Sequence, residues 1–531
     1  MTVRFHISLV LVAAAILGGC ATLPPGSSFP RTESFALAHP EETRLGRPFI
    51  AAASEHGGNS GFRIIPAGAD GFAIRMQMIN AAERTLDLQY FIFHGDETGR
   101  QLTYALLGAA DRGVRVRVLV DDGDTDPGDE QLALLEAHPK VNIRIFNPFA
   151  YRGHSKALRA IEFVLEHPRL DYRMHNKLLV VDNSVALIGG RNIGDQYFQI
   201  DPESQFADDD VFAAGPIAQD LSKTFDEYWN NGLSIPVQAL AGDTTSRPAL
   251  KEHRDELKEQ KQQLKADGID YVKLVATGEP FNGMVSGRLP LIWAHAQVVC
   301  DSPDKKNVEN GAMVGRLMQR AVFSAANAVQ SELLMITPYL IPGNEGMQMF
   351  NDLHRRNARV RVLTSSLEAS TVLPASAGYM HYRVPMIEAG VELYEIRSLL
   401  GNTKGSGESK AMSRFGNYSL HAKMFVFDRK KLFLGSMNFD QRSMHLNTEI
   451  GLIIDSPVLA QQMATRFEAM VQPENSYKVE LRTDGTGTPR SLVWRTRENG
   501  EAVDYDVEPA RNDAQRHKVK LLSLLPMDRE L

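Results

Sequence analysis

One sequence pattern occurs twice in this chain, and it constrains the fold more than any other feature. His175 to Asn192 reads HNKLLVVDNSVALIGGRN, and His421 to Asn438 reads HAKMFVFDRKKLFLGSMN. Both stretches contain His-x-Lys, four residues, Asp, six residues, and then Gly-Gly/Ser-x-Asn at identical spacing. A single short motif of this kind arises by chance in long chains, whereas two copies with the same trailing Gly and Asn indicate a duplicated structural unit.

Each copy is predicted to form a β-hairpin, because two short apolar, β-rich runs flank a polar turn. The runs are 177–181 and 185–188 in the first copy, and 423–427 and 432–434 in the second. Side chains two positions apart on a strand face the same way, so the His and Lys of each motif share a face. The Asp follows its His by seven positions and falls at the turn. It is therefore expected to point away from that face and to support the hairpin, although it completes the catalytic motif. The six motif residues are His175, Lys177, Asp182, His421, Lys423 and Asp428.

The residue types in the two copies suit phosphate chemistry. A Lys supplies positive charge, and an Asn amide beside small residues supplies donors for non-bridging oxygens. Neutral imidazole is a nucleophile and protonated imidazole is an acid near neutral pH, so two such sites facing each other provide both roles. This chemistry requires no metal and no other cofactor. The predicted phosphate-binding residues are Gly190, Asn192, Ser436 and Asn438.

These motifs resemble the phospholipase D superfamily, and most of the chain is similar to its bacterial cardiolipin synthase C-like subgroup. The C-terminal residues Trp494, Tyr505, Glu508 and Pro509 and the run 524–526 share in this resemblance. The resemblance implies an internally duplicated α/β fold with two mixed or parallel β-sheets, flanked by helices and related by pseudo-two-fold symmetry. The implied parts are a first domain at 61–240, an inter-domain segment at 241–305, a second domain at 306–472 and a C-terminal extension at 473–531.

The same resemblance implies a membrane-associated phosphatidyltransferase that works through a phosphohistidine intermediate. His175 is then the nucleophile, and His421 protonates the departing alcohol before it activates the acceptor. Phosphatidylglycerol and phosphatidylethanolamine are the expected substrates. In the family a carboxylate downstream of each Asn orients the nearby His, which points to Asp208 and Glu449, with Asp209 and Asp210 as alternatives in the first half. Arg442 is a candidate to extend the phosphate pocket, with an ordinary ion pair as its alternative role.

Other function classes stay open at this point. A phospholipase D hydrolase releases phosphatidic acid from the same intermediate if water replaces the acceptor alcohol. A phosphodiesterase acting on nucleic acid is disfavoured, because nucleic-acid binders normally carry a basic excess and this chain has a formal net charge of −7 at pH 7. A non-enzymatic envelope protein is disfavoured because both His and Lys pairs are intact.

The N-terminus has the composition of a secretory leader. A basic residue, an apolar run at 7–16 and the sequence Leu-Gly-Gly-Cys predict a lipoprotein-type signal peptide at 1–19 and lipidation of Cys20. A plain signal peptide with a coincidental Cys is the alternative. The stretch 20–60, rich in Pro, Gly and Ser, is expected to be a flexible stalk that tethers the protein to a cell-envelope membrane, facing the periplasm. Ala21 is compatible with the outer membrane. Only Cys300 then remains, so an intrachain disulfide is impossible.

The two halves also share an order of elements outside the motifs. Strand, helix and strand are predicted at 86–92, 99–112 and 114–120, and again at 333–339, 347–356 and 359–364. This order implies parallel strand pairs with right-handed crossovers. Between the halves, 249–266 is a charged helix whose narrow Leu stripe is expected to dock on the body. The loop 403–412 is a candidate lid.

Overall fold

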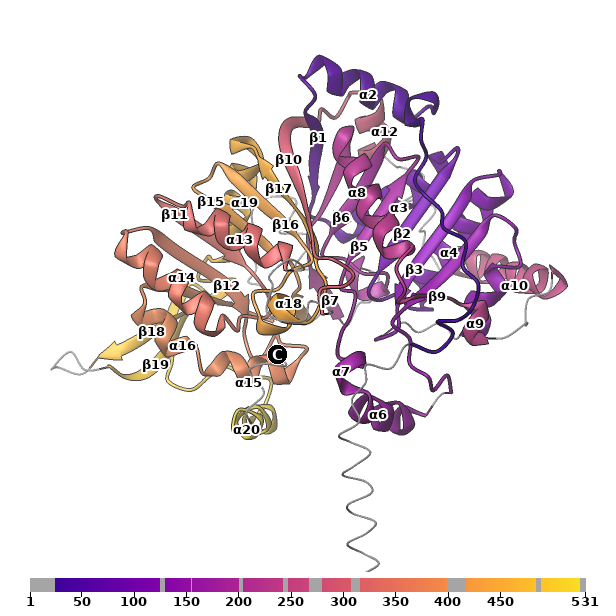
Figure 1. Ribbon diagram of the computed structural model, residues 1–531. Coiled ribbons are helices and arrows are strands. Elements are labelled where there is room, and N and C mark those ends of the chain that lie inside the picture. The colour runs from indigo at the N-terminus through magenta and orange to yellow at the C-terminus, as the bar shows by residue number, and fades with distance from the viewer. Residues whose placement is uncertain are drawn as a thin grey trace, which may run out of the picture.

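The computed structural model describes residues 24–124, 129–153, 155–199, 204–241, 247–266, 279–306, 316–398, 417–483 and 489–525. The predicted leader with Cys20 and the predicted lid at 403–412 lie outside these residues. Figure 1 shows two α/β halves side by side, the first coloured indigo to magenta and the second orange to yellow.

The first half contains a mixed sheet in the order β9-β4-β3-β2-β5-β6-β8-β1. Its strands β2, β3 and β4 are parallel, the first two as the strand–helix–strand order predicts, and the other neighbours are antiparallel. The strands are β1 (Ser60–Ile65), β2 (Thr85–Tyr90), β3 (Arg115–Asp121), β4 (Val141–Phe146), β5 (Lys177–Val181), β6 (Val185–Gly189), β8 (Asp210–Ala214) and β9 (Ser234–Pro236).

The second half repeats this arrangement and confirms the duplication. Its order is β20-β19-β18-β13-β12-β11-β15-β16-β17-β10, again with a parallel trio, β11, β12 and β13. The C-terminal extension adds β18, β19 and β20 to the outer edge. The strands are β10 (Ile292–Cys300), β11 (Glu332–Ile336), β12 (Arg359–Ser365), β13 (Val391–Ile396), β15 (Met424–Phe427), β16 (Lys431–Gly435), β17 (Ile450–Asp455), β18 (Ser476–Thr483), β19 (Pro489–Glu498) and β20 (Glu501–Tyr505).

The two sheets are joined at one edge. β1 pairs antiparallel with β10, with Gly61 opposite Trp293, so backbone hydrogen bonding is continuous across both halves. A second junction pairs β7 (Ser204–Ala207) with β14 (Asn417–Leu420) in parallel. A single apolar core, which includes Leu178 and Met424, draws its residues from both halves. The halves therefore fold against each other as one unit around a shared core.

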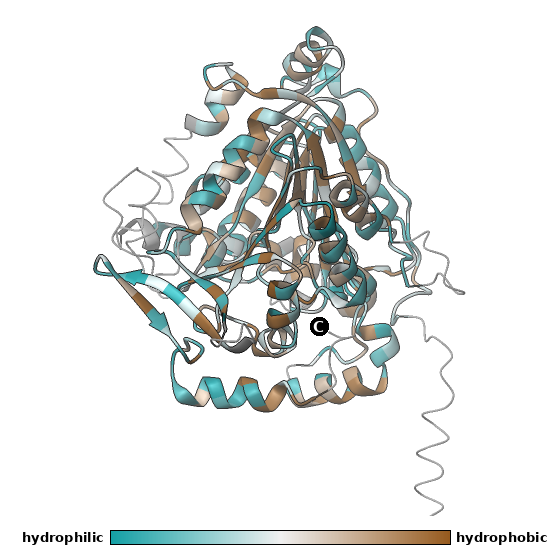
Figure 2. Cartoon of the chain, turned by 90° about the vertical axis from the view of Figure 1, so that its left-hand side faces the viewer, coloured by the Kyte–Doolittle hydropathy of each residue, from teal (hydrophilic) through white to brown (hydrophobic). Residues whose placement is uncertain are grey.

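Helices cover both faces of the sheets (Figure 2). α8 and α19 contribute to the shared core, α3 and α4 pack on the first sheet, and α13 and α14 pack on the second. None of the described helices is long and apolar enough to cross a membrane. The helices are η1 (Pro40–Glu42), α2 (Gly46–Glu55), α3 (Gly68–Ala81), α4 (Glu97–Asp111), α5 (Asp129–Leu135), α6 (Lys156–Leu165), α7 (His167–Leu170), η2 (Asp195–Tyr197), α8 (Pro216–Trp229), α9 (Gln238–Ala241), α10 (Arg247–Ala266), α12 (Glu279–Val285), α13 (Leu317–Asn327), α14 (Gly343–Arg355), α15 (Leu373–Met380), α16 (Arg383–Glu388), α18 (Gln441–His445), α19 (Pro457–Met470) and α20 (Asp513–Leu522).

The prediction of a flexible stalk at 20–60 is wrong for its described part, which begins at residue 24. This segment finds partners on the first half: the Ala36 backbone N–H donates to the Asp226 carboxylate at 2.8 Å, and the Arg31 guanidinium donates to the Gly232 carbonyl at 2.8 Å. Phe49 of α2 is buried. Composition suggested a stalk, but these long-range backbone partners, which composition does not reveal, hold the segment on the body.

The charged helix predicted between the halves is α10, and it docks as expected. Leu250 and Leu257 are buried against the first half, and Arg254 forms an ion pair with Asp111 of α4 at 3.0 Å. The apolar stripe of this otherwise exposed helix therefore packs onto the body.

The two motif Asp residues do not lie at the site of the histidines, so counting them among the catalytic residues is wrong. Asp182 accepts hydrogen bonds from three consecutive backbone N–H groups that lead into β2, those of Glu83, Arg84 and Thr85, at 2.7–2.9 Å. Asp428 does the same for the residues that lead into β11. Both also open their hairpin turn with positive φ, 50° and 52°. They join each hairpin to the neighbouring strand, as their place at the turn predicts.

Replacing Asp182 with Ala should lower the free energy of unfolding by about 2–4 kcal/mol, because three backbone donors lose their acceptor in a largely buried setting. Asp428→Ala is the matched comparison, and we expect a smaller loss there because Gln330 and Ser331 are exposed and water can replace the carboxylate. Urea unfolding followed by circular dichroism measures both. Equal stability of wild type and Asp182→Ala would contradict this role.

Candidate active site

The two motif histidines are held by carboxylates from opposite halves of the chain. His175 Nδ1 lies 2.9 Å from Glu449 Oε2, and His421 Nδ1 lies 2.6 Å from Asp208 Oδ2. All four side chains are at least nine-tenths buried. The two predicted carboxylates are therefore beside imidazoles, and the pairing is crossed: each half orients the histidine of the other half.

Backbone hydrogen bonds across the interface set this crossed pairing. The His175 N–H donates to the Thr448 carbonyl at 2.9 Å, and the His421 N–H donates to the Ala207 carbonyl at 2.8 Å. Thr448 and Ala207 each immediately precede a carboxylate residue, so the same contact places the His and its carboxylate. In Figure 1, β7, which ends at Ala207, and α18 lie between the two halves. The two motifs thus meet in one interface between the halves.

The motif lysines place positive charge next to each imidazole. Lys177 Nζ donates to the His175 carbonyl at 2.7 Å, and Lys423 Nζ donates to the His421 carbonyl. Burial lowers the pKa of Lys177 well below its ordinary value and lowers the pKa of Lys423 to about 8. Because a buried ammonium is poorly solvated, both lysines favour an anion that would neutralise them.

The electrostatic setting keeps both imidazoles neutral in the free protein. Burial, followed by the charges of Lys177 and Lys423, lowers the pKa of His175 well below its usual range. Burial also lowers the pKa of His421 to about 3, against the opposing effect of Asp208. A neutral imidazole that donates its Nδ1–H to a carboxylate has its lone pair on Nε2, which is the atom a nucleophile or general base uses.

The two orienting carboxylates differ in their protonation. Burial acts to raise the pKa of Asp208, but attraction to His421 and Lys423 outweighs it and lowers that pKa to about 2. Burial raises the pKa of Glu449 to about 7, although Lys177 opposes the change. Asp208 is therefore ionised at neutral pH, whereas Glu449 titrates there. The near-symmetric sequence hides this difference between the two pairs.

The small residues of the motifs contact the two carboxylates that hold the histidines. A Cβ added to Gly190 would lie 2.1 Å from Asp208 Oδ1, so only Gly leaves room for that side chain. At the matching position Ser436 donates its hydroxyl hydrogen bond to Glu449. Both were predicted to bind phosphate, and the structure instead gives them contacts with the carboxylates that hold the histidines.

The two motif asparagines are in different states. The Asn192 side chain accepts from the Ile92 N–H at 3.2 Å and donates to the Tyr197 hydroxyl at 2.9 Å. The Asn438 Oδ1 atom is buried and has no hydrogen-bond partner among the described residues. The unpartnered Asn438 atom is an acceptor, so it has capacity left for a donor on a ligand, whereas the amide of Asn192 is already engaged on both atoms.

Arg442 forms an ordinary ion pair, which was the alternative to a role in the phosphate pocket. Its guanidinium donates to an Asp171 carboxylate oxygen at 2.6 Å and to the Asp171 carbonyl at 2.7 Å. Asp171 lies in the first half and Arg442 in the second, so this ion pair spans the interface. Its charge still acts on His175, whose pKa it helps to lower.

Three aromatic residues that the sequence analysis missed enclose the imidazoles. The Phe91 ring meets His175 edge-on at 4.9 Å between centroids. Tyr197 and Phe206 lie against His421, each at 5.2 Å. Such walls exclude water from the imidazoles. The one sequence signal for them was position, because Phe91 directly follows β2 and Phe206 lies two residues before Asp208.

A buried ion pair outside the motifs also supports Glu449. Lys305 Nζ donates to Asp301 at 2.8 Å and to the Asn447 carbonyl at 2.6 Å. The Asp301 N–H donates to the Glu449 carbonyl at 2.9 Å. No sequence motif marks this pair. It fixes the backbone at Glu449, directly before β17.

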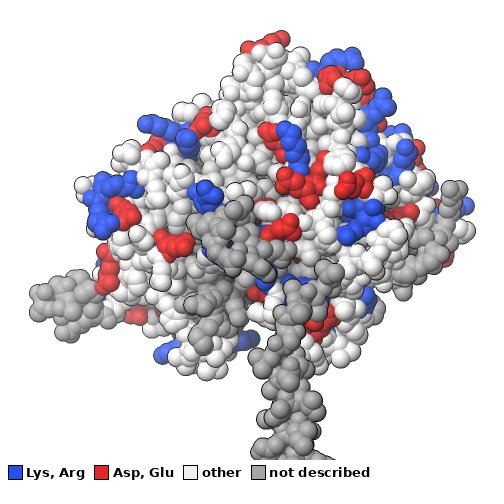
Figure 3. Space-filling model, in the orientation of Figure 1, with Lys and Arg blue, Asp and Glu red and all other residues white. Residues whose placement is uncertain are grey.

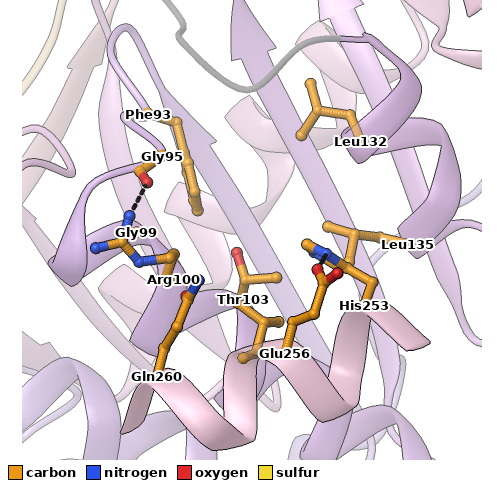
Figure 4. A pocket seen from close by; sticks show the side chains of 11 residues that line it. Phe93, Gly95, Gly99, Arg100, Thr103, Leu132, Leu135, His253, Glu256 and Gln260 are labelled. Atoms are coloured by element: carbon orange, nitrogen blue, oxygen red, sulfur yellow. Dashed lines mark hydrogen bonds and ion pairs between the residues drawn. The ribbon is translucent and has the colours of Figure 1, made fainter. Parts of the chain in front are cut away.

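Neither a metal centre nor the cavity under α10 offers an alternative to the histidine site among the described residues. Among the described residues, no group of three or more His, Cys, Asp and Glu side chains is arranged to hold a metal ion. A cavity of about 230 Å³ under α10 is lined by residues such as Phe93, Arg100, Thr103 and His253 (Figure 4). Neither motif histidine lines it. On the described surface in Figure 3, acidic and basic side chains are interspersed rather than gathered into one basic patch.

Comparison with known proteins places this geometry among phospholipid enzymes. A family model described as "Cardiolipin synthase, PLD-like domain" matches residues 76–229 and 322–471, which contain both histidines and both carboxylates. Cardiolipin synthase C of Escherichia coli (strain K12) is 36% identical over 497 residues, 91% of this chain and 99% of that protein. An uncharacterized protein of Helicobacter pylori (strain J99 / ATCC 700824) is 30% identical over 504 residues, 95% of each. Phosphatidylserine synthase of Haemophilus influenzae Rd KW20 shares the fold, with a TM-score of 0.50 at 13% identity, covering 80% of this chain and 91% of that one.

Proposed function

Because this chain belongs to the cardiolipin synthase family of phospholipase D-like proteins, we propose that it is a phospholipid phosphatidyltransferase that makes cardiolipin through a phosphohistidine intermediate. The observation that carries the proposal is the crossed pairing of two neutral imidazoles with carboxylates, His175 with Glu449 and His421 with Asp208. A pair of oriented imidazoles beside two lysines is what a two-step displacement at phosphorus requires.

In the first step, His175 Nε2 attacks the phosphorus of phosphatidylglycerol. An N–P bond forms, the P–O bond to the headgroup breaks, and the leaving glycerol oxygen takes a proton from His421. His421 must be protonated for this step, and the bound phosphodiester favours that state because its negative charge offsets Lys177 and Lys423. The two lysines and the amide N–H groups of Asn438 would donate to the non-bridging oxygens.

In the second step, His421 accepts the proton of the incoming alcohol. The alcohol oxygen attacks phosphorus, the N–P bond breaks, and His175 returns to its free state. If the acceptor is a second phosphatidylglycerol, the products of both steps are cardiolipin and glycerol. If the acceptor is water, the product is phosphatidic acid, which is the outcome for a phospholipase D hydrolase.

The assignment of roles to the two histidines rests on their surroundings. His421 is paired with Asp208, whose carboxylate is ionised at neutral pH and stabilises an imidazolium. The charges of Lys177 and Lys423 favour the neutral form of both histidines, and the charge of Arg442 adds to this effect at His175. A neutral imidazole suits the nucleophile, and one that gains and loses a proton suits the acid and base.

The proposal is tested by expressing the chain in cells that lack cardiolipin and analysing the extracted lipids. Cardiolipin should appear with the wild type and not with His421→Ala expressed at the same level. Labelled phosphatidylglycerol vesicles, with and without phosphatidylethanolamine, then define donor and acceptor for the purified protein. Phosphatidic acid as the only product would identify a hydrolase, and cleavage of plasmid DNA under the same conditions would contradict a lipid-specific enzyme.

We also propose that Cys20 carries the lipid anchor and that the protein faces the periplasm. The support is the sequence Leu-Gly-Gly-Cys after a short apolar run. Radiolabelled palmitate should be incorporated into the wild type and not into Cys20→Ser. Equal incorporation in both proteins would contradict this anchor.

The rate should have a narrow pH optimum. We expect kcat/KM to fall as the pH drops below about 7, because a protonated Glu449 loses the negative charge that holds the Nδ1–H of His175 and can donate its own proton to Nδ1 instead. It should also fall above about pH 8, where Lys423 loses its charge. In Glu449→Gln this group no longer titrates, so the acid limb should disappear while the basic limb remains. An unchanged acid limb in Glu449→Gln would contradict this assignment.

A further inference from the structure

α6 and the end of α20, with the residues just after it, expose most of the large apolar side chains on the described surface. Seven of the thirteen such residues lie on α6 and at the end of α20. Val164 is 72% exposed and Leu524 is 77% exposed. The seven residues are Leu158, Ile161, Val164, Leu165, Leu521, Leu524 and Leu525. Apolar side chains gathered in this way mark a surface that contacts something else.

The exposed apolar side chains form one stripe along α6 and a second stripe from the last turn of α20 into the residues that follow it. No residue of α6 is buried, and Leu158, Ile161 and Leu165 have the spacing of one helix face. These three line an open groove together with Pro25. In α20 the one buried residue, Val519, packs with Leu367 and Ala377, which leaves the leucines near the C-terminus outside. The stripes are therefore not part of the apolar cores of the described fold.

The two helices lie at the same end of the molecule, on the side of the histidines. Figures 1 and 2 both show that α6 and α20 form its lower end. α7, which follows α6, ends at Leu170, shortly before His175. In Figure 1, α6 lies below the first half and α20 below the second, and β7 and α18 lie between and above them. One flat partner could contact both stripes and face the site.

Both helices carry more basic than acidic residues, whereas the whole chain is acidic. α6 carries Lys156 and Arg159 against one acidic residue, Glu162, and Arg159 also lies 3.5 Å from Asp122 of the body. α20 carries basic side chains against one acidic residue, while the chain has a net charge of −7. The basic residues of α20 are Arg516, Lys518 and Lys520. An apolar stripe flanked by Lys and Arg is typical of helices that lie in the interface of an anionic membrane.

We propose that α6 and the end of α20 dock this protein on the surface of an anionic phospholipid bilayer, with the side of the two histidines toward the lipid. The inference rests on the proposed function, which supplies a substrate held in a bilayer, and it adds the surface that reaches it. Pro25 follows Cys20 closely in the chain and lies against α6. A tether at Cys20 and the stripe of α6 would therefore meet the same membrane.

The test uses an environment-sensitive fluorophore on single introduced cysteines in the full chain. The positions are Val164→Cys on α6, Leu524→Cys after α20, and Val458→Cys on α19 as an equally apolar control, 56% exposed. The unsubstituted protein gives the background from its natural cysteines. With vesicles of phosphatidylglycerol and phosphatidylethanolamine, the emission should shift to shorter wavelength at 164 and 524 and stay unchanged at 458. The shift should weaken in high salt.

A second measurement uses charge to push the surface off the bilayer. Val164→Glu combined with Leu524→Glu should lower turnover of vesicle lipid at least about tenfold, since each apolar side chain loses its burial in the membrane. Turnover of detergent-dispersed lipid should stay unchanged, and Val458→Glu should match the wild type on both. No fluorescence shift at 164 and 524, or an equal shift at 458, would overturn the docking surface. If the wild type turns over neither vesicle lipid nor detergent-dispersed lipid but the fluorescence shift at 164 and 524 is still seen, the result contradicts the proposed function and not the docking surface.

Discussion

His175→Ala is expected to lower kcat for phosphatidyl transfer by about 10⁵-fold, because the variant cannot form the N–P bond through which the reaction passes. The residual rate would come from the lysines, which still hold and polarise the phosphodiester. Labelled phosphatidylglycerol and separation of the products measure the effect. Glu449 and Lys177 keep their places in this variant, so a folded protein is expected, which circular dichroism verifies.

His421→Ala provides the informative comparison. Its slow turnover of natural lipids should resemble that of His175→Ala, because no group protonates the leaving alcohol. A phosphodiester with a p-nitrophenol leaving group needs no such proton. His421→Ala should therefore release one equivalent of p-nitrophenol in a burst, whereas His175→Ala should release none. A burst from His175→Ala would show that His175 is not the nucleophile.

Asp208→Asn should lower kcat by about 10³–10⁴-fold, although the geometry of the site would hardly change. An amide at this position can donate to His421 Nδ1, which would place the proton on Nε2 and prevent the ring from accepting one there. The ionised carboxylate that stabilises the imidazolium is also lost. Steady-state assays with phosphatidylglycerol measure the change.

Asp209→Asn is the matched control for that substitution. Asp209 is the next residue, is as deeply buried, and forms its ion pair with Arg466 at 3.2 Å rather than with a histidine. We expect its effect on kcat to stay within about tenfold and to accompany a loss of stability. Equal losses in the two variants would mean that Asp208 acts through the fold and not through His421.

Local pattern was sufficient to predict the elements that present the motif residues. Two short apolar, β-rich runs around a polar turn predicted each hairpin, and the place of Asp182 and Asp428 at the turns predicted that they point away from the histidines. The repeated strand–helix–strand order predicted the parallel pairs β2–β3 and β11–β12. It did not predict the third strand of each parallel trio, β4 and β13. The predicted features depend on residues close together in sequence, where periodicity is informative.

The contacts between the halves could not be predicted in this way. The pairing of β1 with β10 and the crossed approach of Glu449 to His175 join residues far apart in sequence. A symmetric pair of motifs is equally compatible with carboxylates that orient the histidine of their own half. Composition was also misleading for residues 24–60, whose backbone is held by the first half. The roles of Gly190 and Ser436 depend on the same crossed geometry, because each lies against a carboxylate.

The central claim is that one histidine forms a covalent bond to phosphorus while the histidine of the other half serves as acid and base. It is tested most directly by mixing the protein with ³²P-labelled phosphatidylglycerol, quenching in alkali, where phosphohistidine survives, and mapping the labelled peptide by mass spectrometry. We expect label on His175 in the wild type, more label in His421→Ala with an activated substrate, and none in His175→Ala. Label that persists in His175→Ala, or that resides on a residue other than histidine, would contradict the account.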